Sequence, residues 1–106
     1  MPFKREDDRV IRKAIAEKRM IRFSLDGRER IGEPHDYGMR KGKPSLLVWQ
    51  VGGYSRSGML PEWRWILIEK ASDFELLAEK FAGGRGDDKR QTHSDWEEVW
   101  ARVKPA

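Results

Sequence analysis

The apolar residues near the start of the chain follow a helical period. Four of them fall on one face of a helix over residues 6–19: Val10, Ile11, Ala14 and Ile15. Side chains three and four positions apart share a helix face, so this spacing is typical of an amphipathic helix. Acidic residues come just before the apolar stripe and basic residues just after it, which suits the helix dipole. The pattern predicts an opening helix.

The period then changes to that of a strand. Three apolar residues alternate with polar ones: Ile21, Phe23 and Leu25. Alternation of this kind indicates a half-buried strand. Asp26-Gly27 follows and predicts a two-residue hairpin turn, since both central residues of a type I′ turn need positive φ. A second strand is expected from Arg28 to about Glu33, where Pro34 would end it by lacking a ladder donor.

Further strands are expected in the middle of the chain. Lys41-Gly42 predicts another turn, and Leu46 to Val51 is apolar enough for a central strand. Residues 52–61 read as a loop, and Trp63 to Ile68 as the next strand. Three more apolar residues are expected to extend the core: Phe74, Leu76 and Leu77. The fold class expected is α+β, mostly antiparallel, in one domain over residues 1–82.

Residues 83–106 are expected to form a flexible Gly-rich linker and a short C-terminal helix. Ser94 and Glu97 have capping-box spacing. The residues after them have the i, i+3, i+4, i+7 spacing of a helix stripe: Trp96, Val99, Trp100 and Val103. This stripe would cover an open end of the sheet of the same domain, or else recruit a partner.

Composition limits the classes of function. A chain of 106 residues has the common size of one domain. It contains no cysteine, which excludes disulfides, thiolate metal sites and a cysteine nucleophile and favours the cytoplasm. No apolar run approaches the length of a membrane span. The net charge of +4 is uneven, because residues 1–60 carry an excess of basic residues and the remainder a slight excess of acidic ones.

The sequence gives little sign of catalysis or of a metal. His93, Ser94 and Asp95 are neighbours whose side chains diverge, unlike a catalytic triad. The two histidines have no second ligand at a recognised spacing, so no metal, cofactor or catalytic residue is predicted. His35 next to Asp36 is expected either in a surface turn or as an imidazole tuned by the carboxylate.

Two features favour an anionic ligand. The loop from Gly52 to Gly58 combines free backbone N–H groups with hydroxyl, aromatic and guanidinium side chains, among them Tyr54, Ser55 and Arg56. Its glycines could equally serve only a hairpin turn. Arg64 lies inside an apolar strand, where it must pair with Glu33 or Asp36, reach water, or meet an anion.

The order of these elements resembles the WYL domain over roughly residues 9–72. The resemblance is carried by the Arg28 to Gly38 segment, with its arginines, Glu33-Pro34 and following glycine, and by Arg64 ahead of an alternating apolar strand. Ser45-Leu46-Leu47 stands where the family has Trp-Tyr-Leu. WYL domains are small SH3-like or Sm-like barrels that act in bacterial transcription regulation, so the resemblance implies an opening helix packed on such a barrel and binding without catalysis. It also implies anion contacts at Arg30 and Arg64, with Tyr37 and Gln50 as further pocket residues.

The sequence therefore predicts a non-enzymatic module that binds a nucleotide, an oligonucleotide or another phosphorylated effector. The expected contacts are Arg30, Arg64, Arg56 and the Gly52 to Gly58 loop with Ser55, and Tyr37 or Tyr54 would stack on a base. The alternative is a protein-interaction module, a homodimer or a partner-docking domain, that uses a sheet edge or the C-terminal Trp stripe.

Overall fold

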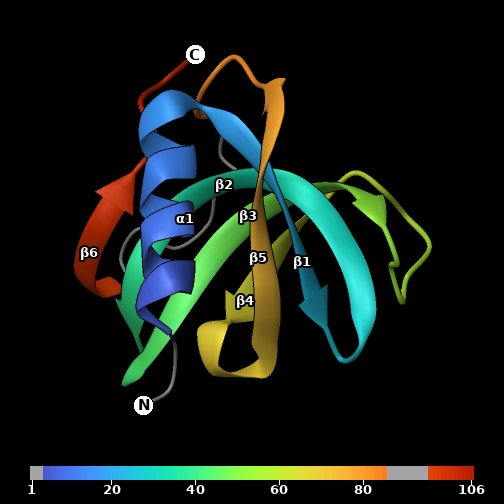
Figure 1. Cartoon of the computed structure of the whole chain (residues 1–106), viewed down its shortest axis with the longest axis horizontal. Helices are drawn as coiled ribbons and strands as arrows, with labels where there is room; N and C mark the ends of the chain where they lie inside the picture. The colour runs from blue at the N-terminus through green and yellow to red at the C-terminus, as the bar shows by residue number, and fades with distance from the viewer. Residues whose placement is uncertain (1–3, 86–95) are drawn as a thin grey trace.

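A computed structural model of the chain describes residues 4–85 and 96–106. These residues form one α-helix, six strands and a short 3-10 helix: α1 (Arg5–Glu17), β1 (Arg19–Leu25), β2 (Arg28–Arg40), β3 (Lys43–Gly53), β4 (Glu62–Leu67), η1 (Ile68–Lys70), β5 (Ala71–Lys80) and β6 (Trp96–Arg102). Figure 1 shows α1 in front of the sheet, between β6 on one side and β5 on the other. The predicted α+β class with a mostly antiparallel sheet is confirmed.

The six strands form one antiparallel sheet that curls around the core. Its strand order is β4-β3-β2-β1-β5, and β6 also pairs with β2. Strand β2 pairs with β1 through its first residues and with β6 through its last ones, and Figure 1 shows it arching over the molecule. Among the described residues β4 and β5 do not pair with each other. The sheet is therefore open and not a closed barrel.

Both predicted hairpin turns are present. Asp26 and Gly27 have φ values of 55° and 73°, and Lys41 and Gly42 have φ values of 54° and 76°. Positive φ at both central residues is the geometry of a type I′ turn, whose twist matches the strands it joins. The turns fix the registers of β1 against β2 and of β2 against β3.

The core lies between α1 and the inner face of the curled sheet. Ile11, Ala14 and Ile15 of α1 are buried against it. Phe23 of β1 stacks on Phe74 of β5 with 5.2 Å between ring centroids. The expected extension of the core into β5 is confirmed for Phe74, which is 7% exposed, and for Leu76, which packs against the cluster.

The prediction that Pro34 ends the second strand is wrong. Strand β2 continues through Pro34 to Arg40. The ladder with β1 stops at Gly32 and the ladder with β6 starts at Asp36, while the register against β3 shifts between Pro34 and Asp36. A proline is tolerated at such an irregularity. Pro34 therefore marks a bend inside one long strand.

The predicted C-terminal helix is also wrong. Residues Trp96–Arg102 form β6, which pairs antiparallel with the second half of β2. Trp100 packs edge-on against Tyr37, and Trp96 packs against Trp65. Local spacing favoured a helix, but pairing with a distant strand satisfies the backbone and places both indoles against the sheet. Ser94, the expected helix cap, lies outside the described residues.

The start of the predicted linker is hydrogen-bonded to the last residues of the chain. Gly84 N–H donates to the Lys104 carbonyl at 2.7 Å, and Ala106 N–H donates to the Gly84 carbonyl at 3.2 Å. Gly84 and Pro105 also form an isolated parallel bridge. The chain after β5 thus meets the chain after β6 on one side of the domain.

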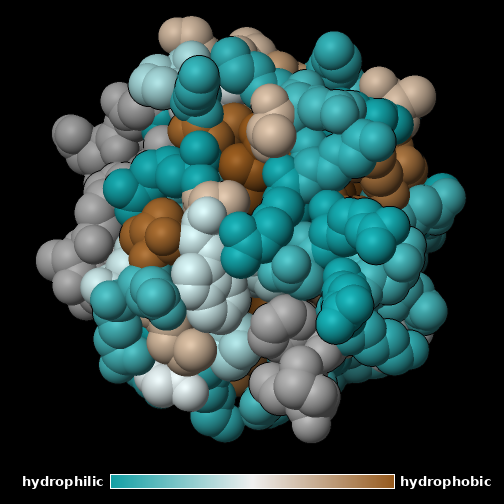
Figure 2. Space-filling model, turned by 60° about the vertical axis from the view of Figure 1, so that its left-hand side comes forward, coloured by the Kyte–Doolittle hydropathy of each residue, from teal (hydrophilic) through white to brown (hydrophobic). Residues whose placement is uncertain are grey.

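The face of the molecule that carries α1 and β6 is mostly hydrophilic. Figure 2 shows apolar side chains there in small, separate groups. Within residues 4–85 and 96–106, no helix has the length and apolar content needed to cross a bilayer.

Replacing Gly38 with alanine should test the pairing of β6. A Cβ at Gly38 would collide with the Glu98 carbonyl, so the variant should lose about 2 kcal/mol of unfolding free energy in urea. Gly52→Ala is the matched control, since its Cβ would lie 3.6 Å from Ile31 in ordinary contact. Equal stabilities of the two variants would contradict a β2 and β6 pairing.

Candidate functional site

A cavity of about 470 Å³ opens where the β1-β2 hairpin faces the loop that follows β3. We call it the arginine pocket. It is lined by Leu25, Asp26, Arg28, Arg30, Tyr54, Arg56 and Arg64. Its size lies within the range of small-molecule sites, about 300–1,000 Å³. Four guanidinium groups and one carboxylate make its lining strongly basic.

The hairpin register places two of these arginines on the core-facing side of β2. Arg28 is paired with Leu25, and Arg30 is paired with Phe23, a core residue. Directly opposite residues of an antiparallel pair share a face of the sheet. The end of the core face is therefore occupied by arginines.

Arg64 reaches the same pocket from β4. It is paired with Val48, a fully buried residue of β3, so it also lies on the core-facing side of the sheet. Strands β2 and β4 flank β3. Arg30 and Arg64 are opposite Gly53 and Val48 of β3, five residues apart, and both side chains line the pocket.

The loop after β3 is anchored against β2 by Gly53 and Tyr54. Gly53 has a φ of 82°, and a Cβ there would collide with the backbone of Glu29 and Arg30. Tyr54 N–H donates to the Glu29 carbonyl at 2.8 Å. The Tyr54 ring then lies 4.1 Å from the guanidinium carbon of Arg28 and 5.2 Å from that of Arg30, within cation-π range.

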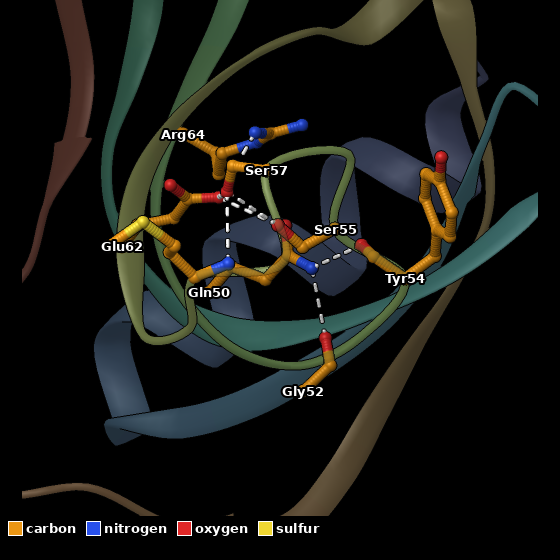
Figure 3. Close-up of polar contacts among 8 residues, drawn as sticks. Gln50, Gly52, Tyr54, Ser55, Ser57, Glu62 and Arg64 are labelled. Atoms are coloured by element: carbon orange, nitrogen blue, oxygen red, sulfur yellow. Dashed lines mark hydrogen bonds and ion pairs between the residues drawn. The ribbon is translucent and has the colours of Figure 1, made fainter.

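Gln50 holds the start of the loop through its side-chain amide. Its amide nitrogen donates to the Gly52 carbonyl at 3.0 Å and to the Tyr54 carbonyl at 2.7 Å. Figure 3 shows this amide between the two carbonyl groups and the Tyr54 ring turned away from the Ser55, Ser57 and Glu62 cluster. Gln50 therefore shapes the pocket without lining it.

Glu62 organises the other end of the loop. Ser55 Oγ and Ser57 Oγ each donate to Glu62 Oε2 at 2.9 Å, and Arg64 Nη1 donates to the same oxygen at 3.2 Å (Figure 3). Burial acts to raise the pKa of Glu62, but these hydrogen bonds and the charge of Arg64 together lower the pKa below its ordinary value. Glu62 is therefore held ionised beside the pocket.

Arg30 is the most unusual group in the lining. Its side chain is 3% exposed, and its Nε and Nη1 atoms are buried without a hydrogen-bond partner among the described residues. Burial is the larger cause and repulsion from Arg64 the smaller one, and together they lower the pKa of this guanidinium. A buried, unpaired cation costs free energy, so the pocket holds a charge that a bound anion would neutralise.

The structure brings four of the predicted site residues together. Arg30, Arg56, Arg64 and Tyr54 all line the pocket. Arg64 also pairs with Glu62, so the expectation that it pairs with Glu33 or Asp36 is wrong. Those two carboxylates bind Arg85 and Arg102.

The other three predicted residues do not line it. Tyr37 is fully buried in the core, and its hydroxyl donates to Asp8 Oδ1 of α1 at 2.7 Å. Burial raises the pKa of this phenol. Gln50 and Ser55 act on the loop instead, through the contacts described above.

Three lining residues were not predicted: Leu25, Asp26 and Arg28. The Asp26-Gly27 turn was recognised only as a turn. The signal for Arg28 was present in it, because that turn fixes the register that pairs Arg28 with Leu25 and Arg30 with Phe23. The inward face of this strand can thus be read from the turn and the alternation alone.

The expectation of a surface turn at His35 is wrong. His35 lies inside β2 and is fully buried. Its Nε2 accepts a hydrogen bond from Arg85 N–H at 3.2 Å, so Nδ1 carries the proton and donates to the Glu33 carbonyl at 2.9 Å. The ring also packs against Trp63. His35 thus fixes the chain after β5 to the sheet, while His93, Ser94 and Asp95 lie outside the described residues.

A second, smaller cavity of about 380 Å³ lies between the end of α1 and β6. Its lining includes Arg12 and Arg102, which are paired with Asp8 and Asp36. Its arginines are therefore already neutralised, unlike Arg30. Across the described residues, no group of three His, Cys, Asp or Glu side chains is arranged to hold a metal ion.

Comparisons of this chain with family models, with curated proteins and with solved structures found no match.

Replacing Arg30 with methionine should raise the stability of the free protein. The variant removes buried donors that have no partner, so the unfolding free energy should rise by about 1–3 kcal/mol in urea titrations. Arg9→Met, at an exposed position of α1, is the control and should change stability by less than about 0.5 kcal/mol. A clear loss of stability in Arg30→Met alone would show that Arg30 is structural.

Replacing Glu62 with glutamine should give a pH-dependent loss of stability. The folded pKa lies below the ordinary value of 4.5, so ionised Glu62 stabilises the fold above that pH, and this contribution disappears as the pH falls through the lowered pKa. The variant should be less stable by about 1 kcal/mol near neutral pH. Urea unfolding at neutral and acidic pH measures this difference. A difference that stays constant across the range would contradict the assignment.

Proposed function

We propose that this chain is a non-enzymatic, cytoplasmic module that binds a phosphorylated ligand in the arginine pocket, as a nucleotide, an oligonucleotide or another phosphorylated effector. The supporting observation is Arg30, a residue that is 3% exposed and whose Nε and Nη1 atoms have no hydrogen-bond partner among the described residues, at a cavity that three further arginines line. Arginine binds phosphate oxygens through charge-assisted, often bidentate hydrogen bonds.

The resemblance to WYL domains agrees with this proposal. Arg30 and Arg64 are the two residues that it assigned as anion contacts, and both line the pocket. We propose that the curled, open sheet corresponds to the SH3-like barrel of that family and that the module serves transcription regulation.

The alternative of a protein-interaction module or homodimer has less support. One of its two expected surfaces was the stripe of Trp96 and Trp100, and these rings contact Trp65 and Tyr37 of the same chain. The outer edges of β4 and β5 remain as surfaces for that alternative. The buried Arg30 Nε and Nη1 atoms, which have no hydrogen-bond partner among the described residues, favour an anionic ligand over this alternative.

Fluorescence anisotropy with a labelled single-stranded oligonucleotide, together with thermal shifts against mononucleotides, tests the proposal. Binding should raise the unfolding temperature, and Arg64→Ala should weaken it about tenfold or more while Arg9→Met has no effect. Four arginine–phosphate contacts imply that oligonucleotide affinity falls about 50-fold between 50 and 200 mM salt. The absence of any Arg64-dependent binding across this panel would overturn the proposal.

A further inference from the structure

The charge of the arginine pocket sets the charge of its ligand. Its lining contains four guanidinium groups against the carboxylate of Asp26. Among the described residues, Arg64 is the one of these four arginines with an ion-pair partner, Glu62. After both carboxylates are counted, two positive charges remain. A ligand that neutralises the pocket must therefore bring at least two negative charges into a small volume.

The surroundings of Tyr54 argue against recognition of a base. Its ring lies 4.1 Å from the guanidinium carbon of Arg28 and 5.2 Å from that of Arg30. A stacked base would have to compete with these cations for the ring. Leu25 is the one aliphatic residue in the lining. We therefore infer that Tyr54 supports and positions the arginines and does not stack on a base.

The size of the pocket exceeds the need of one phosphate. A water molecule occupies about 30 Å³ of liquid, so a cavity of about 470 Å³ has room for a ligand of several linked groups. The arginines approach from three elements: Arg28 and Arg30 from β2, Arg56 from the loop and Arg64 from β4. Planar guanidinium groups on different sides require acceptor oxygens on more than one side of the ligand.

We propose that the arginine pocket recognises a diphosphate group, two phosphates joined through one oxygen, either free or at the end of a nucleotide. This inference rests on the proposed function and narrows its ligand class. Arg30 and Arg64, at the inner end of the pocket, contact one phosphate. Arg28 and Arg56, on the hairpin and the loop, contact the other.

Isothermal titration calorimetry of the full chain with pyrophosphate, orthophosphate, AMP, ADP, adenosine and a short oligothymidylate tests this proposal. Pyrophosphate should bind about tenfold or more tightly than orthophosphate, since each phosphate contacts its own arginines. ADP should bind within about threefold of pyrophosphate, AMP should resemble orthophosphate, and adenosine should not bind.

The following variants test whether the preference for pyrophosphate over orthophosphate comes from the arginine pocket. Arg28→Met should reduce pyrophosphate binding to the level of orthophosphate, whereas Arg9→Met should leave the preference unchanged. Tyr54→Ala should weaken pyrophosphate binding and Tyr54→Phe should restore it, because the ring and not the hydroxyl supports the cations.

Some binding results would overturn the diphosphate inference without overturning the proposed function. AMP binding as tightly as ADP would show that the second phosphate is not recognised, and binding of adenosine would show that the base is. Oligothymidylate binding without pyrophosphate binding would show that internal phosphodiesters are recognised. Any of these results would overturn the diphosphate inference and leave the proposed function standing. If no phosphorylated ligand binds, both the inference and the proposed function are overturned.

Discussion

Strand β2 pairs with β3 over most of its length, with β1 through its first residues and with β6 through its last ones. This shared strand determines the shape of the sheet. The register shifts near Pro34 separate the two ladders, and beyond that bend β2 carries β6 across to the side of α1. The same strand also fixes the pocket, because its first residues continue the inner face of the sheet beyond the core with Arg28 and Arg30. One strand therefore determines the shape of the sheet and supplies two of the four arginines of the pocket.

The pocket is an end of the core that is filled by cations. On the inward face, β2 carries Arg28 and Arg30 near its start and the core residue Tyr37 further on, and β4 carries Arg64 two positions before the core residue Ile66. Placing Arg30 there costs stability in the free protein, since burial and a second guanidinium both disfavour its charge. Proteins keep such costs where a function needs them. The proposed ligand would remove this cost by neutralising the charge.

Local patterns predicted those parts of the fold that local physics decides. The helix period around Ile11 and the Asp26-Gly27 turn correctly gave α1 and the first hairpin. The C-terminal segment was mispredicted because its structure depends on pairing with β2, whose residues lie more than fifty positions away. Pro34 was misread because its tolerance in a strand depends on where the neighbouring ladders end.

The candidate site was predicted in part for the same reason. Arg64 was noticed because it interrupts an apolar strand pattern, and Arg30 because the resemblance to WYL domains implies an anion contact there. Arg28 was missed because the Asp26-Gly27 turn was read only as a turn, although the register that it fixes places Arg28 on the inner face. Tyr37 was assigned to a pocket, yet its ring fills the core and its hydroxyl binds Asp8. An aromatic residue in a strand carries no local signal that separates these roles.

The most direct test of the central claim is the NMR signal of the Arg30 side-chain Nε–H during titration with pyrophosphate. If the arginine pocket binds the anion, the Arg30 signal moves in a saturable way together with those of Arg28 and Arg64. The Nε–H signal of Arg9 stays in place. The claim that this buried cation is an anion-binding site would be contradicted if the Arg30 signal stays in place while the signals of exposed arginines move. It would also be contradicted if no arginine signal moves.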